Sequence, residues 1–213
     1  MKSILISIQP KWIKKIVNEE KTIEMRKTAP KQVPFKCYIY ATKGTIDNSL
    51  LISKDSHHAI IGDYRNAFNC DGDGNIDWNI GNGKVIGEFV CDKVDVYDFS
   101  NYEAEYRITH IEQKAMCLNQ PELIQYGDGQ PLYGWHISDL KIYDEPKRIS
   151  DFLKPCPDPF HYCTICKHCV KVIPPDEEEY ALYHGGQFEY WEEHCTNRLT
   201  APPRSWRYVE ENE

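Results

Sequence analysis

The sequence has no apolar segment long enough to cross a membrane as a helix. Such a helix needs about 18 consecutive apolar residues, and no run in these 213 residues approaches that length. The N-terminus also lacks a basic stretch followed by an apolar core and a cleavage site, which is the pattern of a secretory leader. We therefore expect a cytoplasmic protein that does not associate with membranes.

A uniformly basic surface is missing as well, because the formal net charge is −8. This balance argues against a protein that grips DNA over its whole surface. The charge is nevertheless uneven: residues 1–46 contain ten Lys and Arg against three Glu, which gives +7 and leaves −15 for the rest. Such a basic region either attracts a phosphate-bearing ligand or is a lopsided solvated surface.

The nine cysteines cannot all form disulfides within the chain, since their number is odd. Five of them lie in the segment 155–199, which has little apolar sequence for a core of its own. The Cys-x2-Cys spacing there is typical of a structural zinc site. We predict zinc ligands at Cys156, Cys163, Cys166 and Cys195, with Cys169 or a histidine as a substitute. Because the distant half lacks a Cys-x2-Cys of its own, disulfides or unpaired thiols remain alternatives.

The first 43 residues carry the clearest pattern of secondary structure. An apolar, β-branched run at 3–8 predicts a buried strand. Pro10 then suits the first position of a helix, because its φ is already helical and no N–H is needed there. The helix has one apolar stripe and is expected to end at Asn18, a residue type that tolerates a left-handed conformation. The stripe consists of Trp12, Ile13, Ile16 and Val17.

A second strand follows this helix, and its charged and apolar residues alternate. The alternation places Glu24 and Arg26 on one face and Ile23 and Met25 on the other, with Lys21 at the start of the strand. Neighbouring opposite charges of this kind are either a solvated salt bridge or part of a binding site.

The rest of the chain indicates a mainly β protein with a few short helices. Tyr38 and Tyr40 share a strand face with Lys36, an arrangement that either stacks bases beside phosphates or simply fills a sheet. Strands are expected at 35–43, 84–97, 132–137, 140–143 and 202–209, helices at 111–116 and from 121 with Asn119 as cap, and an insertion loop at 45–83. Together these elements predict an α+β domain built around a small mixed β-barrel.

Five segments, in the right order, resemble the ASCH (activating signal cointegrator homology) domain of the PUA-like superfamily, and the match is most similar to bacterial and phage-borne members. The segments are Ile6–Trp12, Glu20–Thr28, Val85–Phe89, Gly134–Ile137 and Pro202–Trp206. The resemblance implies a PUA-like barrel made of residues 1–154 and 200–213. Its N-terminal helix covers one opening, and the cleft beside that helix takes the ligand.

The resemblance also implies that this cleft binds RNA or a modified nucleoside or nucleotide. Ser205 and Trp206 are placed in the cleft by the resemblance alone. The full set of predicted ligand-binding residues is Lys11, Trp12, Lys21, Glu24, Arg26, Ser205 and Trp206. Replacing Lys21 or Arg26 by Ala is expected to weaken binding and to leave the melting temperature nearly unchanged.

Two other functions stay open. Some small ASCH proteins hydrolyse acetylated cytidine with a Lys and a Thr of this motif and a Glu in a later helix, and others are described as ribonucleases. Lys21 matches the Lys, but Glu24 replaces the Thr, and segment 116–118 has no carboxylate. Lys21 as charge stabiliser and Glu24 as base remain candidates for phosphodiester cleavage. The other function is a protein-interaction adaptor that uses the zinc-bearing segment.

Overall fold

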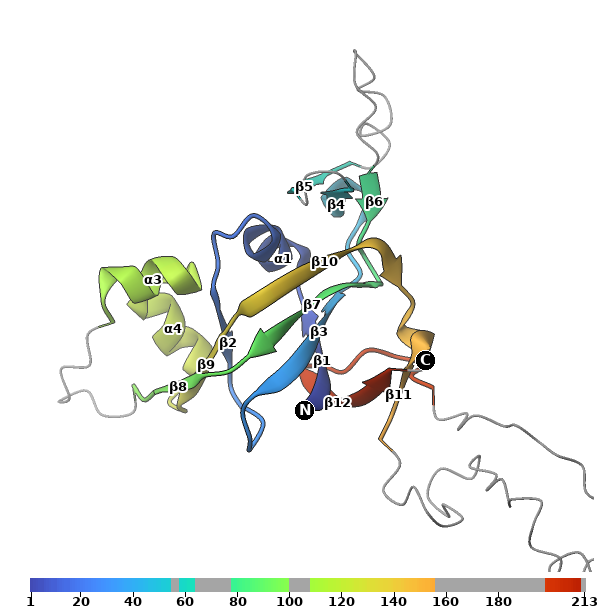
Figure 1. Cartoon of the computed structure of the whole chain (residues 1–213). Coiled ribbons are helices and arrows are strands. Elements are labelled where there is room, and N and C mark those ends of the chain that lie inside the picture. The colour runs from blue at the N-terminus through green and yellow to red at the C-terminus, as the bar shows by residue number, and fades with distance from the viewer. Residues whose placement is uncertain (55–57, 64–77, 100–107, 156–197, 212–213) are drawn as a thin grey trace, which may run out of the picture.

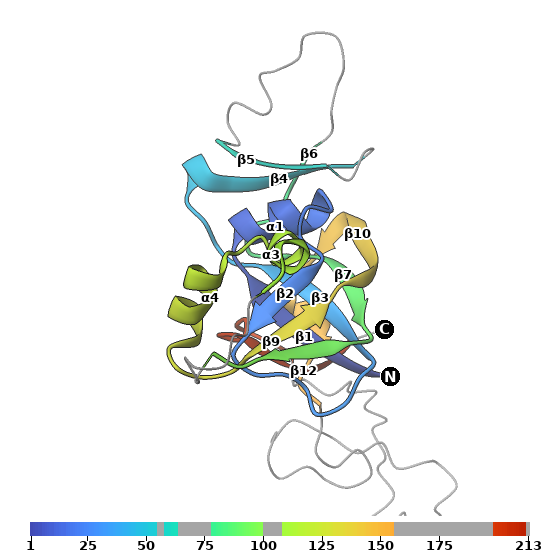
Figure 2. The same cartoon turned by 90° about the vertical axis from the view of Figure 1, so that its left-hand side faces the viewer.

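A six-stranded sheet forms the centre of the molecule (Figure 1). The computed structural model describes residues 1–54, 58–63, 78–99, 108–155 and 198–211. The strands lie in the order β10-β7-β3-β1-β12-β11, and all neighbours are antiparallel except β1 and β3. Their bounds are Lys2–Ile8 for β1, Phe35–Ala41 for β3, Val85–Cys91 for β7, Ser138–Lys147 for β10, Phe152–Leu153 for β11 and Trp206–Glu211 for β12. The sheet curls into half of a barrel (Figures 1 and 2).

A second sheet faces the concave side of the first. It contains β2 (Ile23–Arg26), β9 (Leu132–His136) and β8 (Val94–Tyr97), in the order β2-β9-β8. Trp135 of β9 is fully buried and makes edge-to-face contacts with Phe35 and Trp206. These contacts join the second sheet to the first across the core.

Two short helices cover the other face of the second sheet. They are α3 (His110–Met116) and α4 (Gln120–Gly127), and both begin with a capping box, on Thr109 and Asn119 respectively. The predicted cap at Asn119 is therefore confirmed. Ile23 and Met25 pack against Met116 and Leu123 of these helices. The predicted alternation of β2 is confirmed too, since its two apolar residues face the helices.

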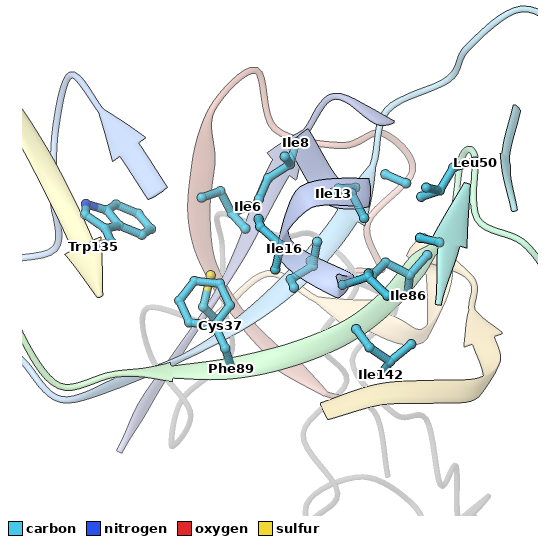
Figure 3. Packing of buried hydrophobic residues seen from close by; sticks show 14 of the residues in the cluster. Ile6, Ile8, Ile13, Ile16, Cys37, Leu50, Ile86, Phe89, Trp135 and Ile142 are labelled. Carbon is cyan, nitrogen blue, oxygen red and sulfur yellow. The ribbon is translucent and has the colours of Figure 1, made fainter. Parts of the chain in front are cut away.

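Helix α1 (Pro10–Val17) begins at the predicted proline and covers one opening of the half-barrel (Figure 1). Its buried residues Ile13, Ile16 and Val17 meet the core of the large sheet (Figure 3). The predicted left-handed residue is wrong by one position, because Asn18 has a φ of −84° and Glu19 has a φ of +58°. The side chain of Asn18 instead exchanges two hydrogen bonds with the backbone of Ala59.

The segment 45–83 contains more structure than the predicted loop. A short 3-10 helix, η1 (Ile46–Asn48), leads into a three-stranded antiparallel sheet with the order β5-β4-β6. The bounds are Ser49–Ser53 for β4, Ala59–Gly62 for β5 and Trp78–Ile80 for β6. Figure 2 shows this small sheet above α1, and Leu50 and Ile52 of β4 join the same core as Ile13. Helix α1 is thus packed between two sheets.

The predicted long strand 84–97 is two strands in different sheets, β7 and β8. Gly87 lies at a close backbone crossing, where a Cβ atom would stand 2.4 Å from the carbonyl oxygen of Lys141. The register between β3 and β7 also shifts next to this glycine. Gly87 therefore marks a bulge in the sheet.

The chain closes the half-barrel with β12, which pairs with β1. Before it, the 3-10 helix η2 (Ile149–Asp151) leads into β11, and a single bridge joins Leu153 to Arg198. The N–H of Leu199 donates to the carbonyl of Phe152 at 2.8 Å. We call this paired stretch, 152–153 with 198–199, the stem. The predicted α+β class with a mixed β-barrel and a covering helix is confirmed, and the barrel sheet is curled into a half-barrel. Residues 156–197 of the predicted Cys-rich unit lie outside the described residues.

No helix within the described residues is long and apolar enough to cross a membrane.

Candidate binding cleft beside helix α1

A cleft of about 440 Å³ opens between the first turn of α1, strand β2, helix α4 and the segment before β12. Its residues come from stretches that are far apart in the sequence and that the half-barrel brings together. The described residues that line it are Ser7, Ile8, Gln9, Lys11, Trp12, Lys21, Glu24, Met25, Arg26, Thr42, Leu118, Tyr126 and Arg204.

Lys21 lies at the floor of the cleft, and only 2% of its side chain is exposed. Its ammonium group donates to the carbonyls of Ile23, at 2.8 Å, and Met116, at 2.6 Å. Glu24 Oε2 is 3.6 Å from the same nitrogen. Burial lowers the pKa of Lys21, and the neighbouring Glu24 carboxylate opposes that shift. The ammonium group is therefore held by three acceptors from two elements.

Glu24 and Arg26 extend this arrangement along β2. Glu24 Oε1 lies 2.9 Å from Arg26 Nη2, and both side chains are at least nine-tenths buried. The same Nη2 atom donates to the carbonyl of Ser7 at 2.8 Å. Arg26 Nε is buried and has no hydrogen-bond partner among the described residues. Lys21, Glu24 and Arg26 together form what we call the charge cluster.

An aromatic ring and further cations surround the mouth of the cleft. The half-buried ring of Trp12 has the ammonium groups of Lys11 and Lys21 at 4.8 and 5.4 Å from its centroid. Tyr126 lines the opposite side, and Arg204 enters from the segment before β12. Among the described lining residues, four cations (Lys11, Lys21, Arg26 and Arg204) thus face one carboxylate. The cleft lining is therefore cationic, and Glu24 is the one carboxylate among the described lining residues.

The structure brings five of the seven predicted ligand-binding residues together: Lys11, Trp12, Lys21, Glu24 and Arg26 line the cleft. Ser205 and Trp206 do not. Trp206 pairs in register with Ile6 of β1, packs against Trp135 and donates its indole N–H to Thr28 Oγ1 at 3.0 Å. Ser205 offers its backbone carbonyl to the N–H of Ser7.

Arg204 lines the cleft but was not among the predicted ligand-binding residues. It belongs to the Pro-Pro-Arg-Ser-Trp stretch of the sequence motifs, but the strand begins only at Trp206. The alternation of side chains along a strand therefore does not predict which way Arg204 and Ser205 face. Ser7 was also missed as a lining residue, although it lies in the first quoted motif.

The tyrosines of β3 are not available for stacking. Tyr38 and Tyr40 are almost fully buried and belong to a second apolar cluster with Leu5 and Phe152, on the face of β1 and β3 that looks away from Ile4 and Ile6. Lys36 on the same face pairs with Glu88 at 3.1 Å. The positive charge of the first 46 residues is therefore not gathered in one patch, and only part of it reaches the cleft.

The cleft lacks the second carboxylate that the acetylcytidine hydrolases would need, as far as the described lining residues show. Glu112 and Glu122 each close a capping box at the start of a helix. Leu118, which belongs to the segment 116–118 that has no carboxylate, lines the cleft wall. Lys21 and Glu24, the two predicted catalytic residues, contact each other in the charge cluster.

The predicted zinc ligands Cys156, Cys163, Cys166, Cys169 and Cys195 lie outside the described residues. Within the described part of the chain, no three His, Cys, Asp or Glu side chains are grouped so that they could hold a metal. Cys37 and Cys91 are free thiols in the core, and burial raises the pKa of Cys91 to about 12 and that of Cys37 well above its usual value. Both remain protonated at neutral pH.

The half-barrel, the cleft beside α1 and the charge cluster define an α+β protein with a cationic cleft. No model of a protein family matches the chain, and no curated protein matches it. Among solved structures, the chain is similar to ASCH from Zymomonas mobilis, with 14% identity over 98% of this chain and 88% of that chain and a TM-score of 0.44.

Two mutants of the same Zymomonas mobilis protein are also similar to this chain. One has 14% identity over 99% of this chain and 90% of that chain, with a TM-score of 0.45. The other has 16% identity over 70% and 77%, with a TM-score of 0.41.

Proposed function

We propose that the cleft binds RNA or a nucleotide-like small molecule by its phosphate and its base. The observation that carries this proposal is the charge cluster, which buries two cations and one carboxylate at the floor of a cleft whose mouth holds an aromatic ring. The motif resemblance described above implies the same class of ligand. A cleft of about 440 Å³ also falls within the size range of small-ligand sites.

The phosphate is expected to bind among Lys11, Arg26 and Arg204. The Nη2 atom of Arg26 is already held by Glu24 and the Ser7 carbonyl, which fixes the plane of the guanidinium. Its remaining N–H groups then serve an anion without a further loss of side-chain freedom. Lys11 and Arg204 are exposed residues at the edge of the cleft, where they add charge to the phosphate site.

The base is expected to stack on Trp12 and to donate to Glu24. Stacking on an aromatic ring suits every base, because each has a π face. The carboxylate of Glu24 lies between the cations of Lys21 and Arg26 and offers acceptor oxygens to a ligand. It therefore favours a base edge with amino or imino N–H groups, as in cytosine, adenine or guanine.

A binding measurement tests this proposal directly. Fluorescence anisotropy with a fluorescein-labelled 12-nucleotide single-stranded RNA of mixed sequence gives the affinity, and unlabelled mononucleotides serve as competitors. We expect Arg204→Gln to weaken binding by about 5-fold or more and to reduce the slope of log affinity against log salt by about one phosphate contact. The matched control is Lys31→Gln, which removes an exposed cation outside the cleft. The proposal is wrong if neither RNA nor mononucleotides bind, or if both variants behave like the wild type.

A further inference from the structure

Ser7 is the point at which the two arginines of the cleft are connected. We propose that Ser7 is a positioning residue that fixes Arg204 and Arg26 relative to each other and so preforms the phosphate site. This inference rests on the proposed function for its binding consequence, but its structural part concerns the ligand-free protein.

All three polar atoms of Ser7 are used, and the residue is only 8% exposed. Its hydroxyl donates to the carbonyl of Pro203 at 2.6 Å, and its N–H donates to the carbonyl of Ser205 at 2.8 Å. Its own carbonyl accepts from Arg26 Nη2 at 2.8 Å. Arg204 therefore lies between two carbonyls that are both anchored to Ser7.

The Ser7 hydroxyl supplies a hydrogen-bond donor to the Pro203 carbonyl, where the backbone has none to offer. The ladder between β1 and β12 ends with the pair Ile6 and Trp206, so Ser7 is the first residue beyond it. The facing segment begins with Pro202 and Pro203, and neither has an N–H to continue a ladder. A side-chain donor from β1 is then the means by which the Pro203 carbonyl is bound.

This arrangement matters because the residues that it holds have like charges. Two arginines that line one cleft repel each other, and Arg204 has an exposed side chain. Anchoring its backbone limits how far that side chain can move away from Arg26. When both cations are already in place, binding a phosphate does not have to order their side chains. The phosphate therefore binds with higher affinity than it would to a site with mobile cations. Ser7 itself does not need to contact the ligand for this effect.

The ligand-free experiment is hydrogen exchange followed by mass spectrometry on the wild type, Ser7→Ala and Ser7→Thr. We expect Ser7→Ala to speed exchange in a peptide covering 200–206 by about 10-fold, since an anchoring hydrogen bond is lost. Exchange in β9 should not change, and Ser7→Thr, which keeps the hydroxyl, should resemble the wild type. Ser3→Ala on the same strand is the matched control. Unchanged exchange in 200–206 would overturn the inference whether or not RNA binds.

The binding experiment is a double-mutant cycle with the labelled 12-nucleotide RNA. Ser7→Ala should weaken binding by about 3- to 10-fold in the wild-type background and have no further effect when Arg204→Gln is already present. Equal losses in both backgrounds would show that Ser7 acts by another route. If Ser7→Ala does not fold, Ser7→Cys, a weaker donor of similar size, takes its place. Faster exchange in Ser7→Ala, with no binding of RNA or mononucleotides by the wild type, would refute the proposed function and leave the anchor in place.

Discussion

The ammonium nitrogen of Lys21 lies 2.6 Å from the carbonyl oxygen of Met116, 95 residues further along the chain. This hydrogen bond connects the floor of the cleft to the last turn of α3. A cation at the C-terminal end of a helix is favourable, because the unpaired carbonyls there carry partial negative charge. Lys21 is consequently part of the framework as well as part of the cleft.

The first prediction concerns stability. Lys21→Met should lower the free energy of unfolding by about 3 kcal/mol, because it leaves two buried carbonyls without a donor and removes one partner of Glu24. This expectation replaces the one drawn from the sequence, in which the melting temperature hardly changed. Urea unfolding followed by tryptophan fluorescence measures the effect. Lys15→Met, which removes an exposed pair with Glu20, should cost no more than about 1 kcal/mol, and equal effects of the two changes would contradict the assignment.

The second prediction concerns Trp12. Trp12→Leu should weaken binding of the labelled RNA by about 1–3 kcal/mol, the range measured when a stacking ring is removed. The salt dependence of RNA binding should be the same in this variant as in the wild type, since no cation is lost. Trp12→Phe should recover part of the affinity. A change in salt slope with no change in affinity at low salt would argue against stacking.

The third prediction concerns catalysis. We expect hydrolysis of acetylated cytidine to be absent or very slow, because a carboxylate at Glu24 stands where the related hydrolases have a hydroxyl nucleophile. Chromatographic separation of cytidine from its acetylated form after long incubation is a sufficient assay. Glu24→Thr is the informative variant, since it restores the motif residue. Rapid turnover by the unmodified protein would show that another group does the chemistry.

The fourth prediction concerns acid stability and Asp95. This carboxylate lies 2.9 Å from Lys93 Nζ and 2.7 Å from His136 Nε2. Burial acts to raise the pKa of Asp95, but the two hydrogen-bonded partners outweigh it and hold the pKa below the usual 3.8. The unfolded chain therefore binds this proton more readily, and the stabilisation is complete above about pH 4 and lost as the pH falls through the lower folded pKa.

Asp95→Asn should accordingly make the unfolding free energy less dependent on pH between about pH 4 and pH 2. Urea midpoints at several pH values in this range, compared with the wild type, give the slope. Asp92→Asn, which changes an exposed carboxylate between β7 and β8, is the control. A slope identical in Asp95→Asn and the wild type would mean that the contacts do not favour the charged form.

The fifth prediction concerns metal. We propose that the Cys-rich segment carries about one zinc ion per chain, because its cysteine spacing suits a closed structural site. Elemental analysis of protein purified without a metal-affinity resin measures it. Replacing Cys163 and Cys166 by Ser should remove the metal, whereas replacing Cys37, a buried core thiol, should not. Protein with neither zinc nor free thiols would indicate disulfides instead.

The sequence predicted the elements whose pattern is complete within a few residues. The first strand, the proline-started helix and the alternation of β2 follow from local periodicity, and they already bring Lys11, Lys21 and Arg26 into one neighbourhood. The capping residue Asn119 was predictable for the same reason. Local rules of this kind do not depend on the rest of the chain.

What could not be predicted depends on partners far away in the sequence. The strands of the small sheet are short and separated by long connections, so nothing local marks β4 and β6 as neighbours. Trp206 is drawn into the core because its register partner is Ile6, and that register is set by the whole ladder. Arg204 reaches the cleft only because Ser7 anchors its neighbours. The burial of Tyr38 likewise requires Phe152, which approaches from another strand.

The stem described above has a consequence for how this chain tolerates change. Residues 153 and 198 are bridge partners, and 44 sequence positions lie between them. Closing a loop requires only that its two ends meet. A short linker should therefore join these two residues as well. A shortened chain in which a Gly and Ser linker replaces residues 156–197 should therefore keep the stem, the half-barrel and the cleft.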